Sequence, residues 1–550
     1  MSLRLRPPLP EGEFVLRAGS PGQVLAAKAL ERRVWIVAAL VLVGLAAVLR
    51  LSLLARSNWL LEGDDALSAL MALGILDGDR PIMLKNQTYA AAWEPYAMAI
   101  SYALLGVSRV SAKLPALLGS LGLIGTTWLL AREVAGRAAA WFAAVLIAAP
   151  PVYVLVLSLK PWAPYTEVML FGSLSLLCAM RLGWPRPAQR DLAWALGCGM
   201  AGGIALWMHP LAVWYLAAAA IVILIRARGT SRLAKVIGCG LAGFALGGLP
   251  IWLFNLQTGG ATLRFILAGS QGQTAERSAV VQAWWTNDLP RGTGLWHPWG
   301  PSSWLLGALM AIWLVGIVAW AVMRRQPRLR PLDAVLVLLV LIPAIYVLSG
   351  FGGPSLNPYG FDATGRYTPP IWVCLSVVGG AALAAVWQRR RLLAIGLAIV
   401  PVAINCAGLV AIDPLAAFQS PYWDRLPAES GQLLAILREE GVQVAVMNHW
   451  AGQPLMFDAA ATSQKLIAYD WYDVQAGGID RFPEYLPVVR SSARFAYVLV
   501  TDEPAPALER RLDELGVAFI ERRAPPYVVV IPTSRRVDPS EVTAALDYRY

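Results

Sequence analysis

The sequence predicts a polytopic α-helical membrane protein, with about eleven transmembrane helices followed by a small C-terminal α/β domain. Three observations predict this fold class. Of 550 residues, 57% are hydrophobic and 15% are charged, whereas soluble domains carry about 25% charged residues. Apolar segments of about 20 residues recur between residues 34 and 411. Beyond residue 411 the hydropathy falls, and short helix and strand patterns alternate.

The apolar segments are each close to the length that crosses a bilayer. The last two of the first six are separated only by His209 and Pro210. We predict spans at 34–55, 111–131, 138–158, 164–182, 191–208, 210–226, 235–256, 302–323, 332–350, 369–387 and 392–411.

Lys and Arg residues gather in short loops that all fall on one side of the membrane if eleven spans are present. That side is the cytoplasm by the positive-inside rule. These residues are Arg32, Arg33, Arg132, Arg137, Arg181, Arg186, Arg190, Arg226, Arg228, Arg232, Lys235, Arg324, Arg325, Arg328, Arg330, Arg389, Arg390 and Arg391. The pattern predicts a multi-pass plasma (inner) membrane protein, with residues 1–33 cytoplasmic and residues 412–550 extracytoplasmic.

The C-terminal segment predicts alternating helices and strands. Helices are expected at 428–440 and 505–515, and strands at 442–447, 496–501, 519–522 and 527–531. The segment contains no glycine-rich nucleotide loop, no P-loop and no nucleophile-elbow motif.

Composition also argues against two other classes of site. The net charge of +11 follows from the cytoplasmic loops, and no basic face with interleaved aromatic residues indicates nucleic-acid binding. Five cysteines all lie in apolar segments without a CxxC spacing, so we expect neither disulfides nor a zinc-cysteine site. They are Cys178, Cys198, Cys239, Cys374 and Cys406.

The loop 57–110 is the most acidic part of the membrane region. Ionisable groups beside hydrocarbon are expensive and tend to be functional. Apolar spacing within the loop predicts two short helices in the membrane interface, at 65–76 and 94–105. The carboxylates of this loop are Glu62, Asp64, Asp65, Asp77, Asp79 and Glu94.

Asp64, Asp65 and Glu94 are the candidate catalytic acids. Each stands at a predicted helix start, where an acid also caps the helix and favours its dipole. The functional alternative is a general base at the outer membrane surface, acting on an acceptor hydroxyl or amine. Glu94, as a second acid near the pair, would orient the acceptor or hold a metal.

Three cations lie near the outer ends of predicted spans: Lys85, Lys160 and Arg366. Each alone is consistent with a cation that snorkels to the membrane surface. Together they would neutralise a phosphate leaving group at headgroup depth. The chain has three histidines, His209, His297 and His449, and all three are predicted on the outer side as candidate metal ligands or turn residues.

Several segments resemble the GT-C superfamily of polyprenyl-phosphate-sugar-dependent glycosyltransferases. Within it the chain is similar to the branch of protein O-mannosyltransferases and lipid A aminoarabinose transferases (glycosyltransferase family 39-like). The resemblance lies in EGDDALSAL (62–70), in WEPYAMAISYALLGVSRVSAKLPALLGSL (93–121), in SLKPWAPYTEVMLFG (158–172), in GRYTPP (365–370) and in segment 448–485. One departure is Asp65, which stands where a glutamate is usual and shortens the reach of that carboxylate.

The resemblance implies an inverting transfer of a monosaccharide, hexosyl or pentosyl, from a polyprenyl-phosphate donor to a lipid, protein or glycan acceptor on the extracytoplasmic side. It implies a GT-C-like catalytic domain over residues 34–411. Asp64 would be the base, with Asp65 and Glu94 as support or metal ligands. Metal dependence varies across the superfamily, so a divalent cation (Mg²⁺, Mn²⁺ or Zn²⁺), with Asp65, Glu94 and His297 as its ligands, stays open.

Lys85, Lys160 and Arg366 would bind the donor phosphate by the same resemblance. The alternative function is a transporter or flippase of a lipid-linked saccharide. Transporters place charged residues near the bilayer midplane, often in broken helices. The predicted spans hold few charges, and Glu167 lies close to an outer end. A third alternative, a binding domain on a membrane anchor, does not require eleven spans.

Overall fold

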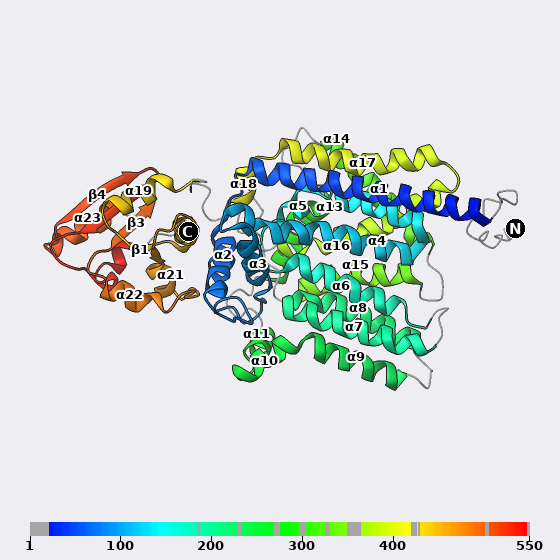
Figure 1. The fold of residues 1–550 in the computed structure, drawn as a ribbon, viewed down its shortest axis with the longest axis horizontal. Coiled ribbons are helices and arrows are strands. Elements are labelled where there is room, and N and C mark those ends of the chain that lie inside the picture. The colour runs from blue at the N-terminus through cyan, green and yellow to red at the C-terminus, as the bar shows by residue number, and fades with distance from the viewer. Residues whose placement is uncertain are drawn as a thin grey trace.

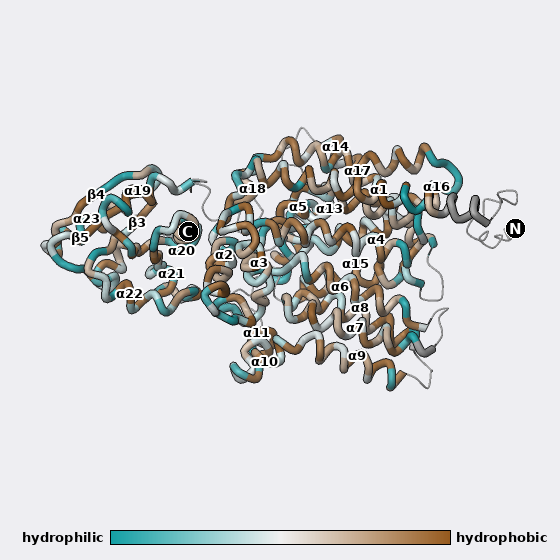
Figure 2. Tube along the Cα trace, in the orientation of Figure 1, coloured by the Kyte–Doolittle hydropathy of each residue, from teal (hydrophilic) through white to brown (hydrophobic). Residues whose placement is uncertain are grey.

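The computed structural model describes residues 21–183, 188–227, 233–268, 276–295, 304–324, 330–348, 365–419, 426, 429–500 and 505–546. Long helices run side by side in one bundle, and a sheet domain lies beyond one end of it (Figure 1). The short helices α2 and α3 lie between the bundle and this domain, whereas α1 (Pro21–Arg56) begins at the far end. The long helices are predominantly apolar (Figure 2).

Seven helices in the described residues are long and apolar enough to cross a membrane. The consecutive helices α9 (Leu233–Gly247) and α10 (Leu249–Gln257), bent by 65°, make an eighth if they form one span. The seven are α1 (Pro21–Arg56), α4 (Arg109–Ala148), α7 (Ala188–Met208), α14 (Trp304–Met323), α15 (Pro331–Leu348), α16 (Pro370–Trp387) and α17 (Arg391–Ala411).

This number is lower than the eleven spans predicted, for two reasons. The predicted spans 111–131 and 138–158 fall on one helix, α4, and on the short α5 (Val152–Leu157). Ala135 and Gly136 have non-helical dihedral angles, so α4 breaks where the loop between these spans was expected. The predicted spans 164–182 and 210–226 fall on shorter helices, namely α6 (Tyr165–Met180) and η1 (Pro210–Ala212) with α8 (Val213–Ala227).

The centre of the bundle is the packing of α16 against α4. A Cβ atom on Gly380 would lie 2.5 Å from Ala139 O, so only glycine permits this approach of the two helices. The proline pair at 150–151 ends α4 and leaves its last carbonyls without helical partners. Side chains of other helices replace those partners: Ala148 O accepts from Arg50 Nη1 at 2.9 Å, and Ala149 O accepts from Asn405 Nδ2 at 2.9 Å.

The two short helices predicted at 65–76 and 94–105 are present as α2 (Gly63–Leu76) and α3 (Trp93–Leu105). They pack on each other and, through α2, on the sheet domain. The other short elements of the membrane region are α11 (Ala261–Ala268), α12 (Arg277–Ala283), η2 (Trp284–Asp288), α13 (Leu289–Thr293), η4 (Gly365–Tyr367) and α18 (Pro414–Phe418).

The C-terminal domain contains a mixed five-stranded sheet of order β2-β1-β3-β5-β4. Strands β1, β2 and β3 are parallel, whereas β5 is antiparallel to both β3 and β4. The strands are β1 (Val444–Met447), β2 (Ile467–Tyr469), β3 (Ala496–Val500), β4 (Phe519–Ala524) and β5 (Tyr527–Pro532). The helical elements are α19 (Gly431–Glu439), α20 (His449–Ala461), α21 (Trp471–Gln475), α22 (Tyr485–Ser491), α23 (Ala505–Glu514), η5 (Pro539–Glu541) and η6 (Thr543–Leu546).

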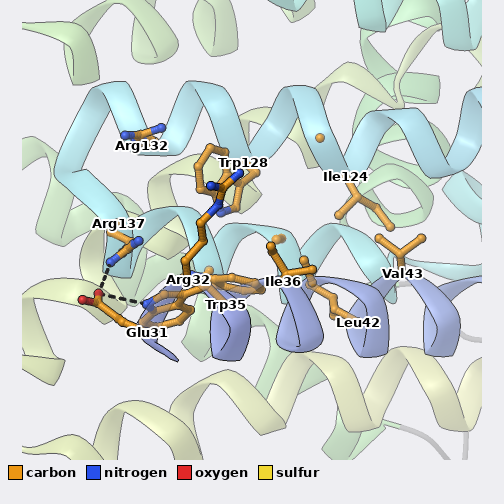
Figure 3. Close-up of a pocket in the computed structure, with 14 residues that line it drawn as sticks. Glu31, Arg32, Trp35, Ile36, Leu42, Val43, Ile124, Trp128, Arg132 and Arg137 are labelled. Carbon is orange, nitrogen blue, oxygen red and sulfur yellow. Dashed lines mark hydrogen bonds and ion pairs between the residues drawn. The ribbon is translucent and has the colours of Figure 1, made fainter. Parts of the chain in front are cut away.

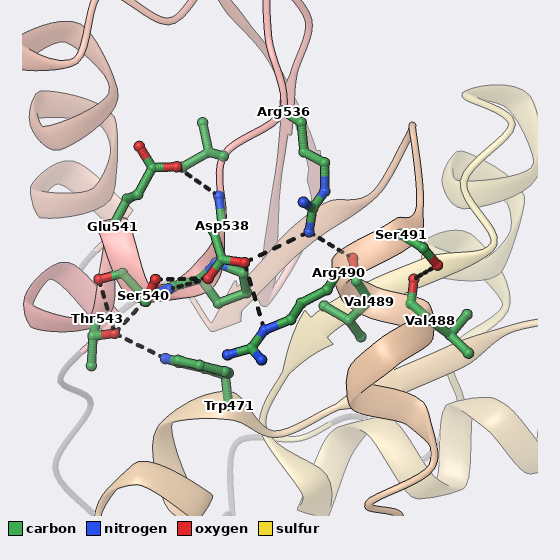
Figure 4. A network of polar contacts seen from close by, with 12 residues as sticks. Trp471, Val488, Val489, Arg490, Ser491, Arg536, Asp538, Ser540, Glu541 and Thr543 are labelled. Carbon is green, nitrogen blue, oxygen red and sulfur yellow. Dashed lines mark hydrogen bonds and ion pairs between the residues drawn. The ribbon is translucent and has the colours of Figure 1, made fainter.

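All predicted helices and strands of this domain are present, whereas β2, α20, α21 and α22 were not predicted. Polar contacts tie α21 and α22 to the end of the chain (Figure 4). Trp471 Nε1 donates to Thr543 Oγ1 at 2.9 Å, and Arg490 Nε lies 3.7 Å from Asp538 Oδ2. Arg536 Nη2 donates to Val489 O at 3.1 Å. These contacts hold α21 and α22 against residues 536–543.

A groove of about 710 Å³ lies between α1 and α4, toward the N-terminal end of α1 (Figure 3). Trp35, Trp128, Arg132 and Arg137 line it, and Arg137 lies 4.7 Å from the Trp35 ring centroid. Tryptophan and arginine are typical of the membrane interface. The groove therefore fits the predicted cytoplasmic end of the bundle, where these arginines were expected.

Candidate functional site

The two aspartates at the start of α2 have different environments. Asp65 and Lys113 form an ion pair with 2.6 Å between Oδ2 and Nζ, and both side chains are fully buried. Asp64 is partly exposed and lies 3.6 Å from Arg481 Nη2 of the C-terminal domain. Successive helical residues point about 100° apart, which places one carboxylate inside and the other at the surface. Asp64 is thus the accessible member of the pair, and Asp65 is the one held in the interior.

Gly63, which begins α2, allows the C-terminal domain to pack closely on this helix. A Cβ atom at Gly63 would lie 2.7 Å from the Trp450 side chain of α20. Arg109 at the start of α4 forms a further contact, a bidentate ion pair with Asp458 of α20. Residues of the membrane region and of the C-terminal domain therefore meet directly at the start of α2.

Glu62 and Glu94 add two buried carboxyl groups beside Asp65. Burial raises the pKa of Glu62 to about 8 against the attraction of Lys160, with Asp65 adding repulsion. Burial also raises the pKa of Glu94, and repulsion from Glu167 and Asp65 acts in the same direction. Within the described residues neither Glu62 oxygen has a hydrogen-bond partner. Glu62 is therefore mostly protonated near neutral pH and able to donate a hydrogen bond, and the shift at Glu94 favours its protonated form as well.

The structure brings two of the three predicted phosphate-binding cations together around Trp162. Lys160 Nζ lies 4.7 Å from the Trp162 ring centroid, and Arg366 Cζ lies 5.8 Å from it. Lys160 is 2% exposed, and its ammonium group has no hydrogen-bond partner in the part of the chain described. Arg366 donates to Tyr367 OH at 3.0 Å, while its Nε has no such partner there. We call Lys160 and Arg366 the cationic pair.

Lys85, the third predicted cation, lies at the contact with the C-terminal domain. It is paired with Glu484 and lies 4.6 Å from the Phe482 ring centroid. No described contact joins Lys85 to the cationic pair. A role in phosphate binding would require Lys85 to exchange its carboxylate partner for a phosphate.

Aromatic side chains connect the cationic pair to Asp64. The Tyr165 ring lies 6.1 Å from the Tyr367 ring and 5.0 Å from the His209 ring. The Tyr89 ring lies 5.5 Å from His209. Burial raises the pKa of Tyr89, and Arg366, Arg481 and Asp64 all act electrostatically on its hydroxyl group. The base candidate and the cationic pair thus lie around one set of connected rings, which we call the aromatic wall: Tyr89, Tyr165, His209 and Tyr367.

Of the two roles considered for His209, metal ligand and turn residue, the described contacts fit the turn residue. Its Nδ1 accepts a hydrogen bond from Leu211 N at 3.2 Å at the start of η1. Burial, with repulsion from Arg366, lowers the His209 pKa to about 3, so the ring is neutral. The neutral His209 ring therefore adds no charge of its own beside Arg366.

The predicted metal ligands Asp65, Glu94 and His297 are not assembled by the described residues, because His297 lies outside them. The group of potential metal ligands found in the described chain is His449, Asp470 and Asp473, in the C-terminal domain. The membrane side of the site thus contains more carboxyl groups, and more buried ones, than the predicted set of metal ligands.

Sequence reasoning missed four residues of the site, namely Glu62, Lys113, Trp162 and Arg481. Glu62, Lys113 and Trp162 stand within one to three positions of a singled-out residue or inside a quoted motif, so their local signal was present. Arg481 lies far along the chain, and only the packing of the C-terminal domain on α2 brings it to Asp64.

By sequence, no family model and no curated protein matches the chain. By structure, it is similar to ArnT from Cupriavidus metallidurans in the apo state, with a TM-score of 0.62 and 14% identity over 94% of this chain and 100% of that chain. ArnT from the same organism bound to undecaprenyl phosphate aligns with a TM-score of 0.59 and 14% identity, over 91% and 98%. An oligosaccharyltransferase from Archaeoglobus fulgidus aligns with a TM-score of 0.49 and 13% identity, over 86% and 71%. The chain therefore shares the fold of ArnT, which agrees with the fold that the resemblance implied.

Proposed function

We propose that this protein is an inverting membrane glycosyltransferase that moves a single sugar from a polyprenyl-phosphate donor to an acceptor on the extracytoplasmic side. The sugar would be a hexose or pentose, and the acceptor a lipid, a protein or a glycan. The positive-inside pattern of the loops supports this orientation. The ArnT structure solved with undecaprenyl phosphate supports a lipid-phosphate donor.

One observation carries the proposal: the cationic pair beside Trp162. A buried ammonium group without a hydrogen-bond partner is costly and calls for an anion. Lys160 is such a group among the described residues, and Arg366 lies against the same ring. A phosphate between them would supply the missing charge and accept from both donors. The pair would bind the leaving group of the transfer.

Asp64 is the proposed base, because its carboxylate is accessible and faces the same aromatic wall. The acceptor O–H or N–H would lose its proton to Asp64 as the acceptor atom attacks the anomeric carbon. The bond from that carbon to the phosphate oxygen breaks, and the electron pair leaves on the polyprenyl phosphate. Attack opposite the leaving group inverts the anomeric configuration.

Asp65 and Glu94 are proposed to support this step from the interior. The Lys113 ion pair fixes Asp65, and with it the first turn of α2 that carries Asp64. Burial favours the protonated form of Glu94, which would donate a hydrogen bond. Lys85 joins the phosphate-binding set once its contact with Glu484 opens. A divalent cation on Asp65, Glu94 and His297 stays a hypothesis that chelation tests.

The experiment is transfer in liposomes from a panel of radiolabelled polyprenyl-phosphate monosaccharides, with and without chelator. Asp64→Asn should lower transfer by about 100-fold or more, the range expected for a lost general base. Asp77→Asn is the matched control, because Asp77 is an exposed acid at the end of the same helix. Transfer that survives in Asp64→Asn would contradict the assignment of the base.

The alternative is a flippase for a lipid-linked saccharide. A flippase would release no polyprenyl phosphate from any donor and would speed movement of the intact lipid across the bilayer. Both readouts come from the same liposomes, so the two functions are separated in one experiment.

A further inference from the structure

His449, Asp470 and Asp473 converge at one point of the C-terminal domain. His449 begins α20, while Asp470 caps the start of α21 and accepts from Asp473 N at 3.0 Å. His449 Nδ1 lies 2.9 Å from Asp470 Oδ2 and 4.0 Å from Asp473 Oδ2. One ligand atom from each residue lies within 4.8 Å of the others. The turn from β2 into α21 and the start of α20 therefore present an imidazole and two carboxylates together.

An independent observation at the same point is Gln453, one helical turn after His449 on α20. Gln453 lines the same small cavity as the three residues above. It is 2% exposed, and its side-chain oxygen has no hydrogen-bond partner within the described chain. A buried carbonyl oxygen left without a partner is costly, because it has lost its hydrogen bonds to water. This oxygen is a further potential metal ligand at the cavity that Gln453 lines.

The local charge favours a cation. Arg481 also lines the cavity, and its guanidinium group extends to Asp64 and to the side-chain amide of Gln87. Asp470 and Asp473 thus place two carboxylates beside one histidine, and Arg481 also lies 3.6 Å from a third carboxylate, that of Asp64.

We propose that His449, Asp470, Asp473 and the side-chain oxygen of Gln453 form a divalent cation site. A nitrogen ligand with carboxylate and amide oxygens suits Zn²⁺ or Mn²⁺ better than Mg²⁺, which prefers oxygen ligands and keeps its waters. Binding displaces the proton between His449 Nδ1 and Asp470 or uses the opposite ring nitrogen, since a metal ligand is an unprotonated nitrogen.

The site has a consequence for Asp64. The segment from Asp473 to Arg481 folds back on the ligands, because a Cβ atom on Gly478 would lie 2.0 Å from Asp473 Oδ2. Asp480 accepts from Tyr469 OH at 3.0 Å and continues directly into Arg481. A cation that fixes Asp473 therefore fixes the segment that carries Arg481 against Asp64. This consequence for transfer rests on the proposed function, whereas cation binding itself does not.

The test uses the full chain in nanodiscs, stripped of metal with a chelator. Zn²⁺, Mn²⁺ and Mg²⁺ are titrated separately, with bound metal measured by mass spectrometry and thermal unfolding followed in parallel. The wild type should bind about one Zn²⁺ or Mn²⁺ per chain and unfold at a higher temperature when loaded. Asp473→Asn and His449→Ala should bind at least tenfold more weakly.

Two further variants keep the test decisive if a ligand variant fails to fold. Gln453→Met keeps the side-chain length, replaces the amide group and its oxygen by a thioether and should weaken binding severalfold. Asp513→Asn, on exposed α23, removes a carboxylate elsewhere in the domain and should bind as the wild type does. A stripped wild type that binds none of the three ions, or ligand variants that bind like Asp513→Asn, would overturn the site.

Transfer measured on the same samples separates the two proposals. Loss of transfer on stripping, restored by Zn²⁺ or Mn²⁺, is the result expected from the position of Arg481. Full transfer by the stripped protein would overturn the link to Asp64. Absence of transfer from every donor in a metal-loaded wild type would instead overturn the proposed function and leave the binding result intact.

Discussion

Replacing Lys160 by methionine should make the protein more stable and its donor binding weaker. The ammonium group of Lys160 is buried without a hydrogen-bond partner among the described residues. Methionine has a similar length and no charge, so it fills the same space without the desolvation penalty. Most substitutions of a functional lysine change only one of these two quantities.

The magnitude follows from three opposing contributions at Lys160. An uncompensated buried ion costs several kcal/mol after relaxation. The Trp162 ring, at 4.7 Å from Nζ, offsets about 2 kcal/mol of this cost, and Glu62 attracts the charge only in its ionised form. The remaining gain in the free energy of unfolding for Lys160→Met is about 1–3 kcal/mol. The lost charge-assisted bond to phosphate is about 2–3 kcal/mol, or roughly 30- to 150-fold in donor affinity.

The assay is thermal unfolding of the donor-free protein in detergent, beside binding of polyprenyl phosphate to the same preparation. Lys113→Met is the matched control, because Lys113 is equally buried but is paired with Asp65 at 2.6 Å. Leaving Asp65 unpaired should destabilise the protein by about 3–5 kcal/mol. If Lys160→Met is destabilised to a similar degree, Lys160 is a structural cation and the proposed phosphate site is refuted.

Three other predictions concern the neighbouring groups. The folded chain holds the Glu62 proton up to a pKa of about 8, against an ordinary value of 4.5, so stability should fall as pH rises through this window. Melting temperatures between pH 5 and pH 9 test this, and Glu62→Gln should flatten the profile; a wild-type profile already flat would contradict it. Arg366→Lys keeps the charge but loses the planar fork, and donor affinity should fall about tenfold with little change in melting temperature. Arg481→Met should lower transfer while leaving polyprenyl phosphate binding unchanged, because Arg481 contacts Asp64; weaker phosphate binding in this variant would place Arg481 in the leaving-group site instead.

Hydropathy predicted where the membrane helices lie but not how the chain breaks within them. Each predicted span falls on a helix, because apolar length is a local property of the sequence. The break at Ala135 and Gly136 and the stop before Pro151 depend on backbone geometry and on partners for the freed carbonyls. Those partners, Arg50 and Asn405, come from helices far apart in sequence. Local patterns carry no information about such contacts.

For the site, too, local features could be predicted from the sequence and long-range contacts could not. Asp64, Lys160 and Arg366 were predicted because charge beside an apolar span is visible in the sequence. The structure places Lys160 and Arg366 beside the same Trp162 ring, and Asp64 acts electrostatically on Tyr89. The partner of each charge was not predictable. Lys85 and Glu484 are 399 positions apart and meet only because the C-terminal domain packs on the acidic loop.

The division of labour between Asp64 and Asp65 follows from helix geometry combined with burial. Two adjacent residues in the first turn of α2 cannot point in the same direction. Asp65 faces the interior and is already paired with the buried Lys113. If Asp65 took up a proton, the bundle would lose this ion pair. The one facing the C-terminal domain keeps an accessible oxygen and an arginine at 3.6 Å. A base must exchange protons with an acceptor that arrives from outside, so of the two aspartates we propose Asp64 for this role. The shorter side chain at Asp65 is consistent with this arrangement, because its partner Lys113 reaches it directly and no longer reach is required.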